Sequence, residues 1–118
     1  TKKKFNITFT PHLAPMYKGI LTTIYFDAYK KIGIDKIHKC LNQYYKNKTF
    51  VKVLKNNTLI STNDVIDTNN CYLSVCKTRN KNKYIILSAI DNLIKGGAGQ
   101  AIQNMNIKYN FAESLGLK

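Results

Sequence analysis

The sequence predicts an α+β fold, a mostly antiparallel mixed sheet with helices on one face. Two kinds of pattern carry this prediction. Apolar and β-branched runs have the length of strands, and they lie at residues 20–26, 50–54, 71–76 and 84–90. Stretches with apolar residues every three or four positions have the spacing of helices, and they follow Gly33 and residue 90. There are more predicted strands than helices, and most of the strands follow one another along the chain. This order favours one sheet with a helical layer.

Residues 5–9 alternate apolar and polar side chains, which predicts a half-buried strand. Residues 10–19 contain two prolines and end in a glycine, which predicts a rigid loop between two strands. This loop carries His12 and Lys18, and a loop with these two groups is a plausible site. The simpler alternatives are a histidine bonded to the loop backbone and a lysine in solvent.

Residues 20–26 are apolar or β-branched throughout, which predicts a central strand covered on both faces. After Gly33, Asp35 can cap a helix. The apolar side of that helix carries Ile37, Cys40, Leu41 and Tyr44. His38 falls among the polar positions, and we expect it to be exposed.

Residues 50–54 predict a short strand that turns at Asn56 and Asn57, before an irregular polar stretch. The runs at 71–76 and 84–90 are joined by a basic loop, which predicts a hairpin. The last helix is expected at about residues 91–110. Its apolar face would be formed by Ala98, Ala101, Ile102 and Met105.

A chain of 118 residues with 44% hydrophobic residues fits one folded domain with a modest core. No apolar run approaches the roughly 18 residues that a membrane span needs. The N-terminus has no signal-peptide pattern. The first residue is Thr1 rather than methionine, so we expect the chain to be an excised or processed piece.

The formal net charge of +13 suggests nucleic-acid binding, but two features disfavour it. Arg79 is the only arginine, although arginine is the usual base-reading residue. The lysines are also scattered rather than clustered on one face. A solvated, lysine-rich surface is the better interpretation, and a basic nucleic-acid-binding module or a structural interaction module remains the alternative.

The three cysteines, Cys40, Cys71 and Cys76, lack the spacing of a metal site. We expect them to be reduced, partly buried thiols in a reducing compartment, which is consistent with a cytoplasmic protein. No serine, histidine and aspartate set and no cysteine beside a candidate base can be identified. The chain therefore looks like a contributor to an active site rather than the carrier of a complete one.

Three glycines, Gly96, Gly97 and Gly99, lie where the last helix should begin. Glycines weaken a helix, but they let another molecule approach the backbone closely, and free N–H groups point outward at a helix start. A cofactor or an anion could dock there. Tight packing of the helix against the sheet explains the glycines equally well. The stretch lacks G-x-G-x-x-G, so it is not a Rossmann phosphate loop.

Two longer stretches are similar to one family. Residues 9–21, FTPHLAPMYKGIL, resemble its segment F-T-P-H-L-x-P-M-x-R-G-I-L. Residues 90–106, IDNLIKGGAGQAIQNMN, resemble its segment I-D-N-L-x-K-G-A-A-G-Q-A-x-Q-N-M-N. Between them, residues 50–54 (FVKVL) resemble F-V-R-V-L. The family is N-acetyl-gamma-glutamyl-phosphate reductase, an arginine-biosynthesis enzyme related to aspartate-semialdehyde dehydrogenase.

The resemblance covers about the C-terminal third of such an enzyme. It implies that residues 1–118 form one domain, a catalytic and dimerisation domain fragment like the C-terminal domain of glyceraldehyde-3-phosphate dehydrogenase. The Rossmann domain for NADP, the nucleophilic cysteine and the catalytic histidine would lie upstream of Thr1, since the family's H-x-P-E segment is absent here. The family reduces N-acetyl-glutamyl phosphate to the semialdehyde with NADPH. A fragment of this kind should be inactive alone.

The resemblance also implies which residues approach the ligands. Asn92 would hydrogen-bond the nicotinamide amide, and Gly96 and Gly97 would let the backbone lie against the cofactor. We place Lys95 in the same cofactor-binding segment. Lys18, where the family has arginine, and His12 would face the substrate. We expect a homo-oligomer formed through the sheet, and an exposed apolar sheet or helix face where the missing half docks.

Overall fold

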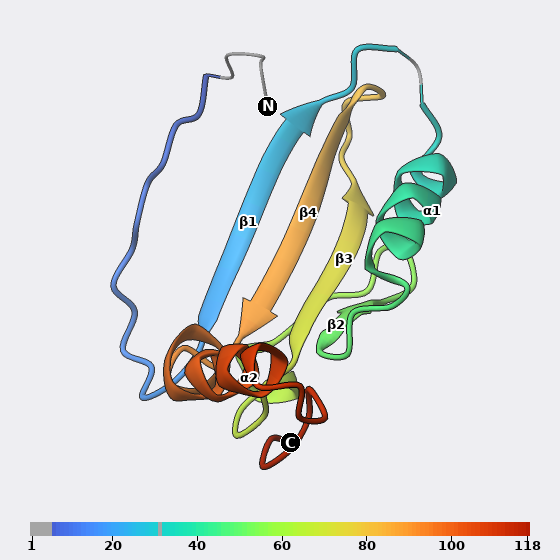
Figure 1. The fold of residues 1–118 in the computed structure, drawn as a ribbon. Coiled ribbons are helices and arrows are strands. Elements are labelled where there is room, and N and C mark those ends of the chain that lie inside the picture. Colours follow the sequence, from blue (N-terminus) through green and yellow to red (C-terminus); the bar gives the residue numbers. More distant parts are fainter. Residues whose placement is uncertain (1–5, 31) are drawn as a thin grey trace.

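The computed structural model describes residues 6–30 and 32–118. Its elements follow one another as β1 (Ile20–Asp27), α1 (Ile34–Tyr45), β2 (Val51–Val53), the helical turn η1 (Thr62–Asp64), β3 (Cys71–Lys77), β4 (Lys83–Ile90), the helical turn η2 (Ile94–Ala98) and α2 (Gly99–Lys108). Four strands and two helices make an α+β arrangement, as predicted (Figure 1). No helix in the described part of the chain is long and apolar enough to cross a membrane.

The strands form one mixed sheet in the order β1-β4-β3-β2. β4 pairs antiparallel with both β1 and β3, whereas β2 pairs parallel with β3. The register places Ile86 of β4 between Ile24 and Val75. The predicted hairpin of β3 and β4 is confirmed. Its strands are central because their long apolar runs can be buried on both faces.

Each face of the sheet has its own small core. On one face, here called the α1 face, Ile34 of α1 packs on Val75 and Tyr84. On the opposite face, Ile60 and Val65 of the segment after β2 pack on Ala89. Alternate residues of a strand point to opposite faces, so β4 serves both cores. Full burial of one such aliphatic side chain contributes about 1.5–3 kcal/mol.

β1 differs from its prediction, because it is an edge strand rather than a covered central one. Its large apolar side chains are 44–66% exposed: Ile20, Leu21, Ile24 and Tyr25. The expectation failed because an apolar run does not by itself distinguish a strand covered on both faces within its own chain from an edge strand. Such a row of exposed apolar groups marks an interaction surface.

Residues 6–9 form no strand and are exposed, so the predicted strand at 5–9 is wrong for them, while Phe5 lies outside the described residues. The segment runs alongside β1 without pairing with it (Figure 1). An alternating pattern forms a strand only where a neighbouring strand takes up its backbone hydrogen bonds.

The helix α1 forms as predicted, but three details differ. Gly33 rather than Asp35 is the N-cap, and Asp35 lies in the first turn, where its carboxylate accepts a hydrogen bond from Asn56. Cys40 is exposed rather than partly buried. His38 is half-buried, and its Nε2–H donates to the carbonyl of Leu54 at 2.9 Å. These side chains lie at the margin of the stripe that faces the sheet, where spacing alone does not decide burial.

The final helix is not continuous over residues 91–110. It is divided into η2 and α2, and the backbone is kinked inside η2, where Gly97 has φ −140° and ψ −111°. Together they lie at the end of the sheet where β4 ends and β1 begins (Figure 1). Asn92, just before η2, contacts Gly19, which directly precedes β1.

Candidate functional site at the end of β4

The two stretches that resemble the reductase family meet through one hydrogen bond. The backbone N–H of Gly19 donates to Oδ1 of Asn92 at 2.6 Å. This donor fixes which end of the Asn92 amide is oxygen, so Nδ2 points the other way. Among the described residues, Nδ2 of Asn92 has no hydrogen-bond partner. The half-buried Asn92 therefore carries a free N–H₂ donor beside the loop that precedes β1.

Gly19 must be a glycine at this contact. Its φ is +108°, a conformation that residues with a side chain rarely adopt. A Cβ there would lie 2.6 Å from Cβ of Thr62. The loop can therefore approach Asn92 only because this position lacks a side chain.

Asp91, which precedes Asn92, is completely buried and was not among the residues singled out from the sequence. Its Oδ1 accepts hydrogen bonds from the backbone N–H groups of Leu93 and Ile94, at 2.8 and 3.0 Å. Its Oδ2 accepts one from the N–H of Asp67 at 2.9 Å. Burial favours the neutral acid and raises the pKa of Asp91. The three backbone hydrogen bonds outweigh burial and hold that pKa below its ordinary value.

Lys18 points to the turn that Asp91 holds. Its Nζ lies 2.6 Å from Oδ1 of Asp67, and the lysine side chain is 23% exposed. The hydrogen bond to Asp67 is the main reason why the pKa of Lys18 is raised. Burial opposes it, and the charges of Asp67 and Asp91 reinforce it. Asp67 itself has φ +59°, a left-handed conformation that aspartate tolerates.

Lys95 turns inward from η2. Its Nζ donates to Oε1 of Gln103 at 2.7 Å and lies 5.4 Å from the centre of the Phe50 ring. Burial lowers the pKa of Lys95, and the nearby acidic side chain of Glu113 opposes that shift in part. Lys95 therefore belongs to the internal packing between η2 and the start of β2.

The sequence suggested two roles for the three glycines, close approach of a ligand to the backbone and tight packing of the helix, and the structure assigns different glycines to each. Gly96 and Gly97 are exposed, and a Cβ on either would make only ordinary contacts at 3.5 Å. Gly99 is buried, and a Cβ there would lie 2.5 Å from Oδ1 of Asn69. Tight packing thus explains Gly99, whereas Gly96 and Gly97 leave the backbone beside Asn92 accessible.

The apolar stripe predicted for the last helix faces outward. Ile102 and Met105 are 36% and 47% exposed, and Ala98 and Ala101 are exposed as well. Gln103 and Asn106 are the buried side chains of α2. Asn106 donates to the carbonyls of Glu113 and Leu115, which holds the C-terminal tail on the helix. Buried polar groups with complete hydrogen bonds can take the inner face, which helical spacing alone does not reveal.

His12 lies in the exposed loop, where its Nδ1–H donates to the carbonyl of Thr10 at 3.2 Å. Its hydrogen bond within the described part of the chain is thus local, whereas Lys18 and Gly19 reach residues far along the sequence. The structure joins Lys18 to Asp67 and Gly19 to Asn92. It does not bond His12 to either pair.

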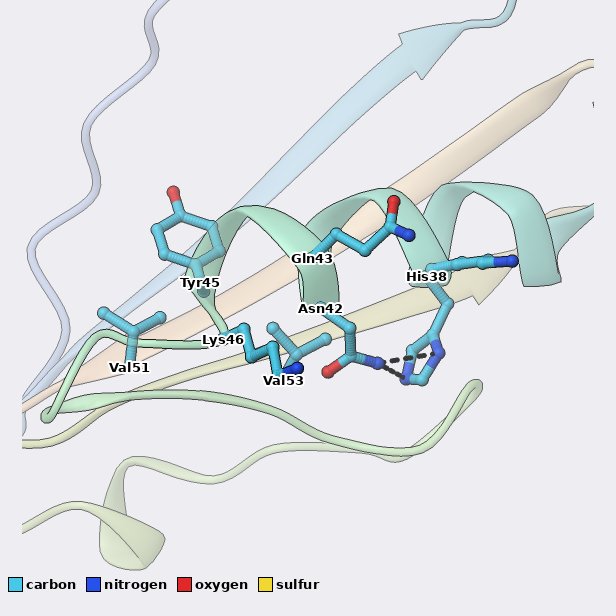
Figure 2. A pocket seen from close by; sticks show the side chains of 8 residues that line it. His38, Asn42, Gln43, Tyr45, Lys46, Val51 and Val53 are labelled. Atoms are coloured by element: carbon cyan, nitrogen blue, oxygen red, sulfur yellow. Dashed lines mark hydrogen bonds between the residues drawn. The ribbon is translucent and has the colours of Figure 1, made fainter.

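A shallow groove of about 480 Å³ lies elsewhere, between α1 and the β2 edge of the sheet (Figure 2). His38 and Asn42 of α1 point toward the side of the groove that Val51 and Val53 line. His38 is already bonded to Leu54, and Nδ2 of Asn42 lies 3.1 Å from the His38 ring. No lining residue belongs to the meeting point at Asn92. The described residues also contain no group of three or more histidine, cysteine or acidic side chains that could hold a metal ion.

Comparisons with known proteins identify the family of this chain. The family model for the semialdehyde dehydrogenase dimerisation domain matches residues 1–92. The N-acetyl-gamma-glutamyl-phosphate reductase of Clostridium botulinum (strain Eklund 17B / Type B) is 50% identical over 114 residues, which are 97% of this chain and 33% of that protein. The enzyme of the same name from Clostridium beijerinckii is 46% identical over 112 residues, 95% of this chain and 33% of that protein. A third, from Thermoanaerobacter pseudethanolicus, is 42% identical over 115 residues, 98% and 33% of the two chains.

The chain spans about a third of the length of the relatives it matches. Their names identify them as oxidoreductases that act on an acyl phosphate, and the resemblance noted in residues 9–21 and 90–106 is thereby confirmed. Because the family model covers most of the chain, this protein belongs to the semialdehyde dehydrogenase dimerisation-domain family.

Proposed function

We propose that this chain is the C-terminal domain of an N-acetyl-gamma-glutamyl-phosphate reductase, which reduces N-acetyl-glutamyl phosphate to the semialdehyde with NADPH in the cytoplasm. Residues 1–118 would form a single domain, and the Rossmann domain, the nucleophilic cysteine and the catalytic histidine would lie in another part of the enzyme. The observation that carries the proposal is the hydrogen bond from Gly19 to Asn92. It joins the two stretches that resemble the family, beside the exposed Gly96 and Gly97.

Asn92 would orient the nicotinamide end of NADP. Its Nδ2 has no hydrogen-bond partner in residues 6–30 and 32–118, and the carboxamide oxygen of a nicotinamide is a matching acceptor. Gly96 and Gly97 would let the ring lie against the backbone, because no side chain covers them. Lys95 would support this segment from within through Gln103. The cofactor itself supplies the hydride.

The loop before β1 would face the substrate. One of the three N–H donors of Lys18 is used by Asp67, and the remaining donors can bind an anionic group of an acyl phosphate. A lysine makes this contact as a point charge, without the bidentate geometry of arginine. His12 lies on the same loop, exposed at its surface.

The exposed apolar side chains of β1 would be covered in a homodimer. Leu21 and Tyr25 project from the face opposite α1, where they are 46% and 66% exposed. The segment after β2 covers β3 and β4 on that face through Ile60 and Val65. β1 thus extends an apolar surface beyond the covered part of the sheet, and a second copy of the domain would bury it. The outward stripe of α2 around Ile102 would face the Rossmann domain.

A graft tests the proposal directly. Residues 1–118 would replace the matching third of the Clostridium botulinum reductase, and NADPH oxidation would be followed with N-acetyl-glutamyl phosphate. We expect turnover that requires the upstream cysteine. The graft with Asn92→Ala should show a raised KM for NADPH, with Asn104→Ala on the exposed side of α2 as the matched control.

A folded graft that binds NADPH and shows no turnover would contradict the proposal. The isolated chain supplies a second measurement. It should neither reduce the acyl phosphate nor bind NADPH in calorimetry, because the cofactor's remaining contacts would come from the Rossmann domain. Micromolar binding of NADPH by the isolated chain would contradict the proposal that the Rossmann domain supplies the remaining cofactor contacts.

A further inference from the structure

Asp91 has no role in the function proposed above. Its carboxylate is completely buried and pairs with no lysine or arginine side chain among the described residues. A buried charge of this kind is costly unless hydrogen bonds compensate it. Within the described residues, its carboxylate accepts hydrogen bonds from backbone N–H groups alone, and these belong to two separate segments of the chain.

The first segment is the start of η2. The N–H groups of Leu93 and Ile94 both donate to Oδ1 of Asp91, so the carboxylate caps the turn. This turn continues directly into Lys95, Gly96 and Gly97. The placement of the exposed glycine backbone relative to Asn92 therefore depends on the cap.

The second segment is the turn at Asp67. Its N–H donates to Oδ2 of Asp91, and its own carboxylate holds Nζ of Lys18 at 2.6 Å. The side chain of Asp67 is 71% exposed, so packing does not hold it in place. The hydrogen bond from the Asp67 N–H to Asp91 fixes the backbone of Asp67. The position of the Asp67 carboxylate, and therefore that of Lys18, depends on this hydrogen bond.

We propose that Asp91 and Asp67 are positioning residues, with Asp91 aligning the cofactor-binding turn and the Lys18 loop through its two oxygens and Asp67 acting on Lys18 alone. This rests on the proposed function, because it assigns cofactor and substrate to the two sides. Neither residue touches a ligand. Asp91 therefore positions residues on both the cofactor side and the substrate side, whereas Asp67 positions Lys18 on the substrate side alone.

Substitutions of Asp67 and Asp91 in the active graft should distinguish the role of each residue. Asp67→Asn keeps a residue that tolerates the left-handed backbone and removes the charge that holds Lys18. We expect the KM for N-acetyl-glutamyl phosphate to rise by up to about tenfold, because a neutral amide oxygen holds Lys18 more weakly than a charged carboxylate does. The KM for NADPH should change less than about twofold, because Asp67→Asn keeps the backbone N–H that donates to Asp91.

Asp91→Asn should raise both KM values. An amide can still accept from one segment through its oxygen, but its N–H₂ group opposes the N–H of the other. Asp64→Asn is the matched control. Asp64 also caps a turn, through the N–H of Ser61, and it contacts neither Lys18 nor η2. This variant should keep both KM values of the unsubstituted graft.

The outcomes are distinct. An unsubstituted graft without turnover overturns the proposed function, and the positioning roles are withdrawn with it. An active graft in which Asp67→Asn leaves the substrate KM unchanged overturns the positioning role, and so does a fall in that KM, which would mean that Asp67 masks Lys18. The Asp67 variant keeps the test decisive even if Asp91→Asn does not fold, since Asp67 is exposed and its backbone contacts are preserved.

Discussion

Gln103 and Lys95 form the internal support of the glycine-rich turn, with Nζ of Lys95 donating to Oε1 of Gln103 at 2.7 Å. The same Oε1 accepts from Nδ2 of Asn69 at 2.9 Å, and Nε2 of Gln103 donates to Glu113 at 2.7 Å. One buried amide thus joins the segment before β3, the turn η2 and the C-terminal tail. The polar side of α2 is its inner side for this reason.

Gln103→Leu should strongly destabilise the domain. The substitution fits the volume but leaves the Asn69 amide and the Lys95 amine without their acceptor. Each unsatisfied buried group costs about 1–3 kcal/mol. We expect the free energy of unfolding in urea to fall by about 2–4 kcal/mol in total on that basis. Gln100→Leu is the control, because the side-chain hydrogen bond that Gln100 makes within the described residues goes to Asn104 on the exposed side of α2, and its loss should change little.

Gly99→Ala should lower the melting temperature, whereas Gly96→Ala should not. A Cβ on Gly99 would lie 2.5 Å from Oδ1 of Asn69 and 2.8 Å from the carbonyl of Ile94. Overpacking of this kind costs about 1–3 kcal/mol. At Gly96 the nearest atom is the Ile90 side chain at 3.5 Å, an ordinary contact. Thermal unfolding of both variants in parallel tests the contrast, and equal melting temperatures would contradict the packing described for Gly99.

The stability of the domain should fall in acid because of Asp91. Its pKa is depressed in the folded state, so its contribution is complete above the ordinary aspartate value of 3.8 and is lost as the pH falls through the lower folded value. Glu113, whose pKa is lowered first by its hydrogen bonds from Thr49 and Gln103, acts in the same direction below 4.5.

Urea unfolding at pH 7 and at about pH 3 measures this loss, since the interval spans the ordinary carboxylate values. Asp91→Asn should unfold more easily at pH 7 and should lose less stability on acidification. A variant whose pH dependence equals that of the unsubstituted chain would show that Asp91 does not account for the acid sensitivity.

Charged substitutions on β1 should weaken self-association. Leu21→Lys and Tyr25→Lys place amines on the apolar face that the proposed dimer buries. A buried unpaired charge opposes association, so we expect the dissociation constant in sedimentation to rise more than about tenfold. Tyr29→Lys is the matched control, because Tyr29 is 97% exposed and lies beyond the end of β1. A monomeric unsubstituted chain would contradict the proposed interface.

The central strands and α1 could be predicted from local patterns. The apolar runs of β3 and β4 are long enough to specify strands, and the loop between them has hairpin length. Of the apolar side predicted for α1, Ile37 and Leu41 pack toward the sheet beside Ile34. Cys40 and Tyr44, which were predicted on the same side, are exposed. These elements follow from periodicity because the surface they bury lies within this chain.

The site was predictable in part. Gly19 and Asn92 lie 73 positions apart, and the family resemblance pointed to both stretches without indicating that they touch. Asp91 was missed, although an aspartate directly after a strand and before a helical turn is a common cap signal. Its second oxygen could not have been assigned from sequence, because Asp67 reaches it only when the chain has folded.

The sequence by itself determined the α+β class, the hairpin, the first helix and the family, since each depends on spacing within a short stretch or on a motif. Tertiary structure alone decided that β1 is an edge, that α2 turns its polar side inward, and that Asp91 joins two distant turns. The physical reason is that hydrophobic periodicity specifies which residues avoid water, whereas burial of Gln103 or Asp91 depends on hydrogen-bond partners from other segments. Those partners become neighbours only in the folded chain.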